Sequence, residues 1–251
     1  VILLLNRRGY SSFVTCKNCG YTVKCPHCDI TLTYHKSSNN LRCHYCGYAT
    51  NITNICPECH EKSLTTLGVG TEKIEEELHT LIPAAKILRM DFDTTSKKGS
   101  HAKMIEEFKE HKYDILLGTQ IVAKGLDFEN VTLVGVVNAD TSLNIPNFRS
   151  SEQTFSLLSQ VAGRSGRSSK TGEVIIQTYN PTHYAIECVK NHDYLDFFNK
   201  EMNIRRRLNY PPYYYVTYIR VSGKDDKICY KESLKIARIL QKYLDKTIIL
   251  G

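Results

Sequence analysis

Hydrophobic residues occur along this 251-residue chain in the two patterns that distinguish strands from helices. Near-continuous apolar runs such as VILLL and YDILLGT are typical of strands buried on both faces of a sheet. Segments such as GTEKIEEELHTLI instead repeat apolar positions every three or four residues, as an amphipathic helix does. We expect strands at residues 1–5, 85–91, 113–119, 131–140 and 172–179, and helices at residues 70–82, 100–111, 151–163 and 183–198. Because strands and helices alternate, the sequence predicts an α/β fold with a parallel sheet and helices on both faces.

The first predicted helix has a clear starting signal and a clear apolar face. Thr71 is a suitable N-terminal cap, and acidic residues follow it in the first turns. Ile74, Leu78 and either Leu81 or Ile82 fall on one side of the helix, which we expect to pack on the sheet.

Eight of the ten cysteines interrupt this α/β pattern between residues 16 and 59, as four C-x-x-C pairs. The pairs are Cys16/Cys19, Cys25/Cys28, Cys43/Cys46 and Cys56/Cys59. Two residues between thiolates allow a tight turn to present both sulfurs to one tetrahedral ion. Four pairs predict two structural Zn²⁺ ions, each held by four thiolates without an open coordination position. Free thiolates also indicate a reducing compartment.

The segment between the second and third pairs indicates which pairs share an ion. Ile30, Leu32 and Tyr34 alternate with polar residues, KSSNN forms a turn, and LRCHYC returns, so a hairpin is expected. The hairpin favours a nested arrangement, with Cys25, Cys28, Cys43 and Cys46 around one ion and Cys16, Cys19, Cys56 and Cys59 around the other. Sequential pairing is the alternative, but it would crowd Cys19 and Cys25 around one ion. With eight thiolates present, we do not expect His27, His44 or His60 to be ligands.

The domain organisation predicted from these patterns is an α/β domain formed by residues 1–14 and 64–194, with a zinc-binding module at residues 15–63 inserted into it. The net charge is +7, and residues 195–251 carry 12 basic and 6 acidic residues, or +6 of that total. This basic segment is compatible with nucleic acid or with a solvated surface. The chain contains no run of about 18 apolar residues, so no membrane helix is predicted. VILLL has no basic leader and no small-residue cleavage site, so it does not look like a signal peptide. The missing initiator methionine suggests a fragment of a longer protein.

Polar residues follow the predicted strands, at the edge where parallel sheets bind ligands. Thr119, Gln120, Lys124, Gly125 and Asp127 follow one strand, Asn6–Tyr10 another, and Asp140 a third. QVAGRSGR at residues 160–167 closes a helix, and we expect Arg164 and Arg167 to face the same edge. The chain contains no G-x-x-x-x-G-K-[ST] motif, so Asp140 is a weak candidate for a magnesium ligand. The arginines would therefore contact a nucleotide phosphate whose main binding site is not formed by these residues.

Six motifs together resemble the PriA family of bacterial replication-restart helicases, which belongs to superfamily 2. They are RRGY, the nested C-x-x-C pairs, GTE, LLGTQIVAKGLDFENVTLV, QVAGRSGR and NYPPY. The resemblance covers nearly the whole chain. It implies an ATP-dependent 3′-to-5′ DNA helicase with two RecA-like lobes, and ATP with Mg²⁺ in the cleft between them. Without a P-loop, this chain resembles the second lobe with its inserted zinc module, followed from residue 195 by the beginning of a small α+β C-terminal domain.

The resemblance also implies roles for single residues. Arg164 and Arg167 would reach the γ-phosphate, Gln160, Gly163, Gly125 and Asp127 would line the nucleotide site, and Thr119, Gln120 and Lys124 would couple it to DNA. The implied partners are forked or single-stranded DNA, single-strand-binding protein and other primosome proteins in the bacterial cytoplasm, with no membrane. The tyrosines at 213–215 follow three arginines and could stack on bases, or form a strand in the alternating YYYVTYIRV. A catalytically inert zinc-dependent nucleic-acid-binding scaffold is the alternative function.

Overall fold

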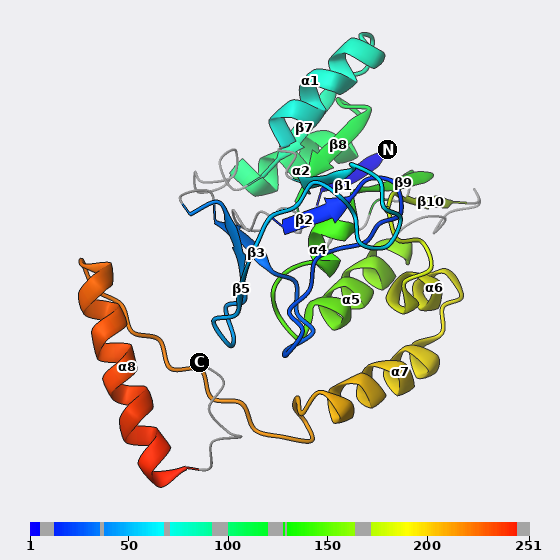
Figure 1. The fold of residues 1–251 in the computed structure, drawn as a ribbon. Helices are drawn as coiled ribbons and strands as arrows, with labels where there is room; N and C mark the ends of the chain where they lie inside the picture. The colour runs from blue at the N-terminus through cyan, green and yellow to red at the C-terminus, as the bar shows by residue number, and fades with distance from the viewer. Residues whose placement is uncertain are drawn as a thin grey trace.

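The computed structural model describes residues 1–5, 13–35, 38–67, 71–91, 100–119, 128, 130–163 and 172–244. Its centre is a sheet of five parallel strands in the order β10-β9-β1-β8-β7 (Figure 1). The strands are β1 (Ile2–Leu5), β7 (Ile87–Met90), β8 (Ile115–Gly118), β9 (Leu133–Val137) and β10 (Glu173–Ile176). Each strand lies inside a segment where the hydrophobic pattern predicts one, so the parallel sheet is confirmed.

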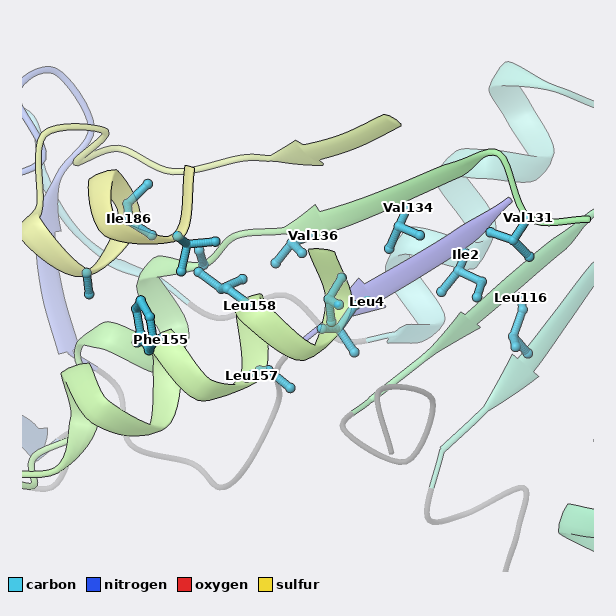
Figure 2. Close-up of a cluster of buried hydrophobic side chains, with 14 of the residues drawn as sticks. Ile2, Leu4, Leu116, Val131, Val134, Val136, Phe155, Leu157, Leu158 and Ile186 are labelled. Atoms are coloured by element: carbon cyan, nitrogen blue, oxygen red, sulfur yellow. The ribbon is translucent and has the colours of Figure 1, made fainter. Parts of the chain in front are cut away.

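Helices cover both faces of the sheet, because the apolar strands present side chains to both. The helices are α1 (Thr71–Leu81), α2 (Ser100–Lys109) and α5 (Ser150–Ala162). Leu4 of β1 and Leu116 of β8 belong to the larger core, to which α2 and α5 contribute (Figure 2). Leu5 and Leu117 point to the other face, where Ile74 of α1 packs. Burying apolar side chains of this size stabilises the fold by about 1.5–3 kcal/mol each.

The apolar face of α1 is shorter than its sequence predicts. Ile74 is buried and Leu78 packs partly against the sheet, as expected. Either Leu81 or Ile82 was expected to complete this face, but neither does, since their exposed fractions are 76% and 48%. The reason is that the end of α1 projects beyond the sheet, where it has no strand to cover (Figure 1).

The cysteine-rich segment forms small antiparallel sheets beside the parallel one. β2 (Phe13–Cys16) pairs with β6 (Leu64–Leu67), so the chain enters and leaves this segment at one place. β3 (Thr33–His35), β4 (Asn40–Arg42) and β5 (Ala49–Asn51) form the second antiparallel sheet. The hairpin predicted around residues 36–40 is therefore present, and Leu32 and Leu41 are buried within it. The exact limits of the inserted module stay a prediction.

The helix predicted at residues 183–198 is wrong, because the structure has two helices there. α6 (Tyr184–Lys190) ends before His192, which has a φ of 53°. α7 (Tyr194–Arg207) then begins after Asp193, whose carboxylate accepts a hydrogen bond of 2.8 Å from the Asp196 amide. The short sequence Asn-His-Asp thus ends one helix and caps the next.

The segment after α7 also differs from its sequence pattern. Alternation in YYYVTYIRV predicts a strand, but residues 215–223 form none, and Tyr215 is fully exposed. A strand needs a hydrogen-bonding neighbour, and the described part of the chain offers none to this segment. The chain continues into α8 (Asp226–Tyr243), which Figure 1 shows set apart from the sheet. Within the described ranges, no helix is long and apolar enough to cross a membrane.

Candidate functional site: two cysteine clusters and two sheet edges

Each of the four C-x-x-C pairs folds into the same turn. The residue after the second cysteine donates its amide to the carbonyl of the first, at 2.9–3.1 Å in all four turns. That residue has a positive φ in every case, and the four residues are Gly20, Asp29, Gly47 and His60. The glycines were visible signals of this turn, whereas Asp29 and His60 adopt the left-handed conformation without the glycine that usually marks it. The repeated turn points the two sulfurs of each pair toward the same place.

The four turns assemble into two clusters. The first cluster is Cys16, Cys19, Cys56 and Cys59, and the second cluster is Cys25, Cys28, Cys43 and Cys46. Within each, the sulfur atoms all lie within 4.8 Å of one another. This is the nested grouping that the hairpin predicts, and the sequential alternative is excluded. His27, His44 and His60 are exposed and belong to neither cluster, as expected.

The geometry of both clusters fits a tetrahedral metal ion. Sulfur pairs approach to 3.6 Å in the first cluster and 3.5 Å in the second. A tetrahedral ion with metal–sulfur bonds of about 2.3 Å places its sulfur ligands about 3.8 Å apart. A disulfide would instead require about 2.05 Å. The two clusters are therefore four-thiolate sites of the kind that holds structural zinc.

The charge state of the second cluster also favours a cation. Burial raises the pKa of the Cys43 thiol above its ordinary value. Burial also raises the pKa of the Cys28 thiol, whereas hydrogen bonds lower that of Cys46. Without a cation the cluster keeps some of its protons, because buried thiolates repel one another in a region of low polarity. A divalent cation replaces these protons and neutralises the sulfur charges, as structural zinc sites require.

The module that carries the clusters packs on the loops that follow β9 and β10. Thr31 donates its hydroxyl to the side-chain oxygen of Asn144 at 3.4 Å, and both residues are buried. The backbone of Gly20 lies directly against the backbone of Tyr179, where a Cβ added to Gly20 would meet the Tyr179 carbonyl oxygen at 2.3 Å. Thus Gly20 serves both the first cluster and the contact with the sheet domain.

We expect Gly20→Ala to destabilise the chain much more than Gly47→Ala, which is its matched control. Both glycines have positive φ, near 77° and 72°, so alanine is strained at both positions, by about 1–2 kcal/mol. Only at Gly20 does the added methyl group also meet backbone atoms, since nothing lies within 4 Å of a Cβ at Gly47. Denaturant unfolding of the metal-loaded chain measures the difference. Equal losses for the two variants would contradict the close packing of Gly20 on Tyr179.

Asp140 follows β9 and is held by the chain itself. Its carboxylate accepts hydrogen bonds from the Tyr179 amide at 2.9 Å and the Thr178 hydroxyl at 3.2 Å. Burial raises the pKa of Asp140, and these two hydrogen bonds oppose that increase. The carboxylate therefore fixes the loop after β10, against which Gly20 packs. This role agrees with the low expectation that Asp140 is a magnesium ligand.

The predicted nucleotide and DNA residues do not all belong to one edge of the sheet. Thr119 directly follows β8, at the carboxyl ends of the strands. Helix α5 runs antiparallel to β1 and β9 (Figure 2), so Gly163 at its C-terminus lies toward their amino ends. Gln160 is in the last turn of α5, is exposed, and donates to the Ser156 hydroxyl at 3.3 Å. Gln160 and Gly163 lie toward the amino ends because a helix that joins parallel strands must run back across the sheet. The expectation that Arg164 and Arg167 face the carboxyl edge stays a prediction, since both arginines lie outside the described residues.

Most residues of the predicted nucleotide and DNA set lie outside the described residues. These are Gln120, Lys124, Gly125, Asp127, Arg164 and Arg167, as well as residues 6–10. Their neighbour Phe128 is described and is buried. Its ring packs edge to face on Phe108 in the last turn of α2, with 4.9 Å between the ring centroids. Since α2 leads into the start of β8, Phe128 also lies toward the amino ends of the strands.

Sequence reasoning missed one cluster that joins the module to α7. Tyr210, from NYPPY, donates its hydroxyl to the carbonyl of Cys28 at 2.7 Å, and its ring stacks on Phe148. The guanidinium of Arg205 lies over the Phe148 ring, 5.2 Å from the ring centroid. Arg205 also bonds to Glu201 at 2.7 Å and to Glu152 at 2.6 Å. No local pattern reveals these contacts, because Cys28 and Tyr210 are 182 residues apart.

Comparisons with known proteins agree with this architecture. The sequence model of the PriA DNA helicase Cys-rich region (CRR) domain matches residues 25–50, and that of the helicase conserved C-terminal domain matches residues 55–169. Domain 2 of the DEAD-box helicase Mss116p, solved with an RNA duplex, has a TM-score of 0.37 and 20% identity over 50% of this chain and 44% of that chain. A likeness this weak carries no conclusion about function.

Curated relatives match the chain over nearly its whole length. The replication restart protein PriA of Bacillus subtilis (strain 168) is 54% identical over 240 residues, which cover 96% of this chain and 30% of that protein. The protein of the same name from Synechocystis sp. is 44% identical over 255 residues, covering 100% of this chain and 31% of that protein. The chain thus spans about a third of the length of these relatives. From these identities and from the match to the PriA Cys-rich region, the chain belongs to the PriA family of replication restart proteins.

Proposed function

We propose that the chain is the second lobe of an ATP-dependent 3′-to-5′ DNA helicase that restarts replication at stalled or branched forks. In this proposal Arg164 and Arg167 reach the γ-phosphate of a nucleotide whose other contacts, with Mg²⁺, belong to a first lobe. Gln160, Gly163, Gly125 and Asp127 line the nucleotide site. The chain by itself is expected to hydrolyse no ATP, because it contains no P-loop.

The observation that supports the proposal is where the described residues on either side of segment 120–127 lie. The segment starts after Thr119 at the carboxyl ends of the strands and ends at Phe128 near their amino ends. Gly163, which precedes Arg164, lies toward the amino ends as well. One short segment therefore connects the edge proposed for DNA, with Thr119, Gln120 and Lys124, to the edge proposed for nucleotide. A motor needs such a connection to couple hydrolysis to movement along DNA.

The described packing around Gly163 gives no structural reason for a glycine at this position. A Cβ added to Gly163 would have ordinary van der Waals contacts, the nearest being the Ser159 carbonyl oxygen at 3.6 Å. Its φ is −74°, which any residue adopts. The packing and backbone of the described chain therefore do not require glycine at position 163. A glycine is useful where a phosphate must approach the backbone closely.

The zinc clusters have a structural role in this proposal. With four thiolates each, they leave no position for a substrate, so they stabilise the fold of the inserted module. Its partners, by the family resemblance, are forked or single-stranded DNA, single-strand-binding protein and other primosome proteins. The basic residues after position 195 give this end of the chain a net charge of +6, which favours a polyanionic partner.

The test of this function is unwinding by the intact protein, with ATP and Mg²⁺, of duplexes that carry either a 3′ or a 5′ single-stranded tail. We expect unwinding of the 3′-tailed duplex and of a forked duplex, and no unwinding of the 5′-tailed duplex. Strand separation is followed by the fluorescence of a labelled strand, with the non-hydrolysable nucleotide as control. If DNA is bound but no ATP is hydrolysed and no duplex is unwound, the inert zinc-dependent scaffold becomes the correct function.

A further inference from the structure

The two cysteine clusters differ in how the rest of the chain covers them. In the first cluster, Cys19 is exposed and Cys59 is half-buried. The other two cysteines of the first cluster are buried. In the second cluster three cysteines are buried and Cys46 is half-buried, so the clusters differ in the exposed Cys19. Tyr210, from outside the zinc module, is only 5% exposed and packs in the same hydrophobic cluster as these cysteines, with the partly buried Phe148 and Leu208 beside it.

Tyr210 contacts the turn that carries the metal ligands. Its hydroxyl donates to the carbonyl oxygen of Cys28 at 2.7 Å, on the ligand itself. Its ring forms a T-shaped contact with the ring of Tyr45, with 6.3 Å between the ring centroids. Tyr45 lies between Cys43 and Cys46 in the sequence. Tyr210 thus holds both C-x-x-C turns of the second cluster.

The same residue is tied to the end of α7 and to the start of α5. The Tyr210 amide donates to the carbonyl of Arg205 at 2.8 Å, and Asn209 before it has a φ of 57°. Arg205 in turn donates to the carbonyl of Pro211 at 3.3 Å and forms an ion pair with Glu152 of α5. The ring of Tyr210 stacks on Phe148 with 5.0 Å between centroids and 11° between planes.

We propose that Tyr210 is a clamp on the second cluster, so that retention of its metal ion and the path of the chain after α7 stabilise each other. The physical basis is linkage. Any contact made only when the ion-bound turn is closed slows loss of the ion, and the bound ion stabilises that contact in return. Within the described residues, no side chain from outside the module donates a hydrogen bond to a ligand of the first cluster. The proposal goes beyond the helicase function and does not depend on it.

The first experiment measures zinc release from the whole chain to a chromogenic chelator. Wild type is expected to release its two ions in two phases, with the faster phase from the first cluster. Tyr210→Phe keeps the ring and removes only the hydroxyl. It should accelerate the slower phase by about 3- to 10-fold, the effect of one hydrogen bond, and leave the faster phase unchanged. Cys59→Ser removes the ion of the first cluster and so identifies its phase.

Tyr213→Phe is the matched control, because Tyr213 lies in the same segment but is 40% exposed, with its ring against Arg206. It should change neither phase. The proposal is overturned if Tyr210→Phe leaves the slower phase unchanged, or if it accelerates both phases equally, which would show general destabilisation.

The second experiment tests the reverse direction by hydrogen exchange. Cys46→Ser, which breaks the second cluster, should increase amide exchange at residues 205–213, whereas Cys59→Ser should not. Unchanged exchange at residues 205–213 in Cys46→Ser would also overturn the proposal, whatever the effect of Tyr210→Phe on folding.

Discussion

Replacement of Cys43 by serine is expected to reduce the metal content of the chain from two zinc ions to one and to unfold part of the inserted module. Cys43 is buried in the second cluster, and its amide and carbonyl both belong to the turn that carries the ligands. A serine oxygen at this position is a poor substitute for a thiolate toward zinc. The loss should therefore remove much of the apparent binding free energy, which is about 10–16 kcal/mol for structural zinc sites at neutral pH.

The expected result is measured by metal analysis together with hydrogen exchange of residues 25–51. The first cluster should keep its ion, because its ligands come from the other two C-x-x-C pairs. Cys229→Ser is the control, since Cys229 is a half-buried cysteine on α8 outside both clusters. Retention of two ions in Cys43→Ser, with unchanged exchange, would contradict the assignment of Cys43 as a ligand.

The features that the sequence could predict are those set by local spacing. The grouping of the cysteines followed from the hairpin between residues 30 and 46. Its two strands bring the pair Cys25/Cys28 beside the pair Cys43/Cys46, which leaves the two outer pairs to share the other ion. The parallel sheet followed from apolar runs such as VILLL, whose residues face the two faces of the sheet in turn. The sequence makes Asp140 a poor candidate for a magnesium ligand, which stays a prediction; in the structure its carboxylate accepts hydrogen bonds from Thr178 and Tyr179.

The features that the sequence could not predict depend on distant partners. The alternating residues after 213 fit a strand, but a strand forms only against another strand. The clamp between Tyr210 and Cys28 joins segments 182 residues apart, so no periodicity signals it. The edge on which Gly163 lies depends on the direction of α5, which follows from the topology and not from the motif. The break at His192 is different, because its polar cap residues were visible but the apolar pattern on both sides outweighed them.

Replacement of Arg167 by alanine is the second change with a large expected effect. If Arg167 stabilises the charge that develops on the transferring phosphoryl group, its loss should slow ATP hydrolysis by about 10³- to 10⁵-fold. Arg167→Lys should restore little of this rate, because an ammonium group lacks the planar fork that binds two phosphate oxygens. Arg238→Ala is the control, since Arg238 is an exposed arginine on α8.

The measurement that tests the central claim most directly is ATP hydrolysis by the intact protein at saturating single-stranded DNA, combined with equilibrium binding of a nucleotide analogue. We expect Arg167→Ala nearly to abolish DNA-stimulated hydrolysis, while its nucleotide affinity stays close to that of the wild type and Arg238→Ala behaves as wild type. DNA-stimulated hydrolysis at the wild-type rate in Arg167→Ala would contradict the claim that this lobe supplies the arginine that acts on the γ-phosphate.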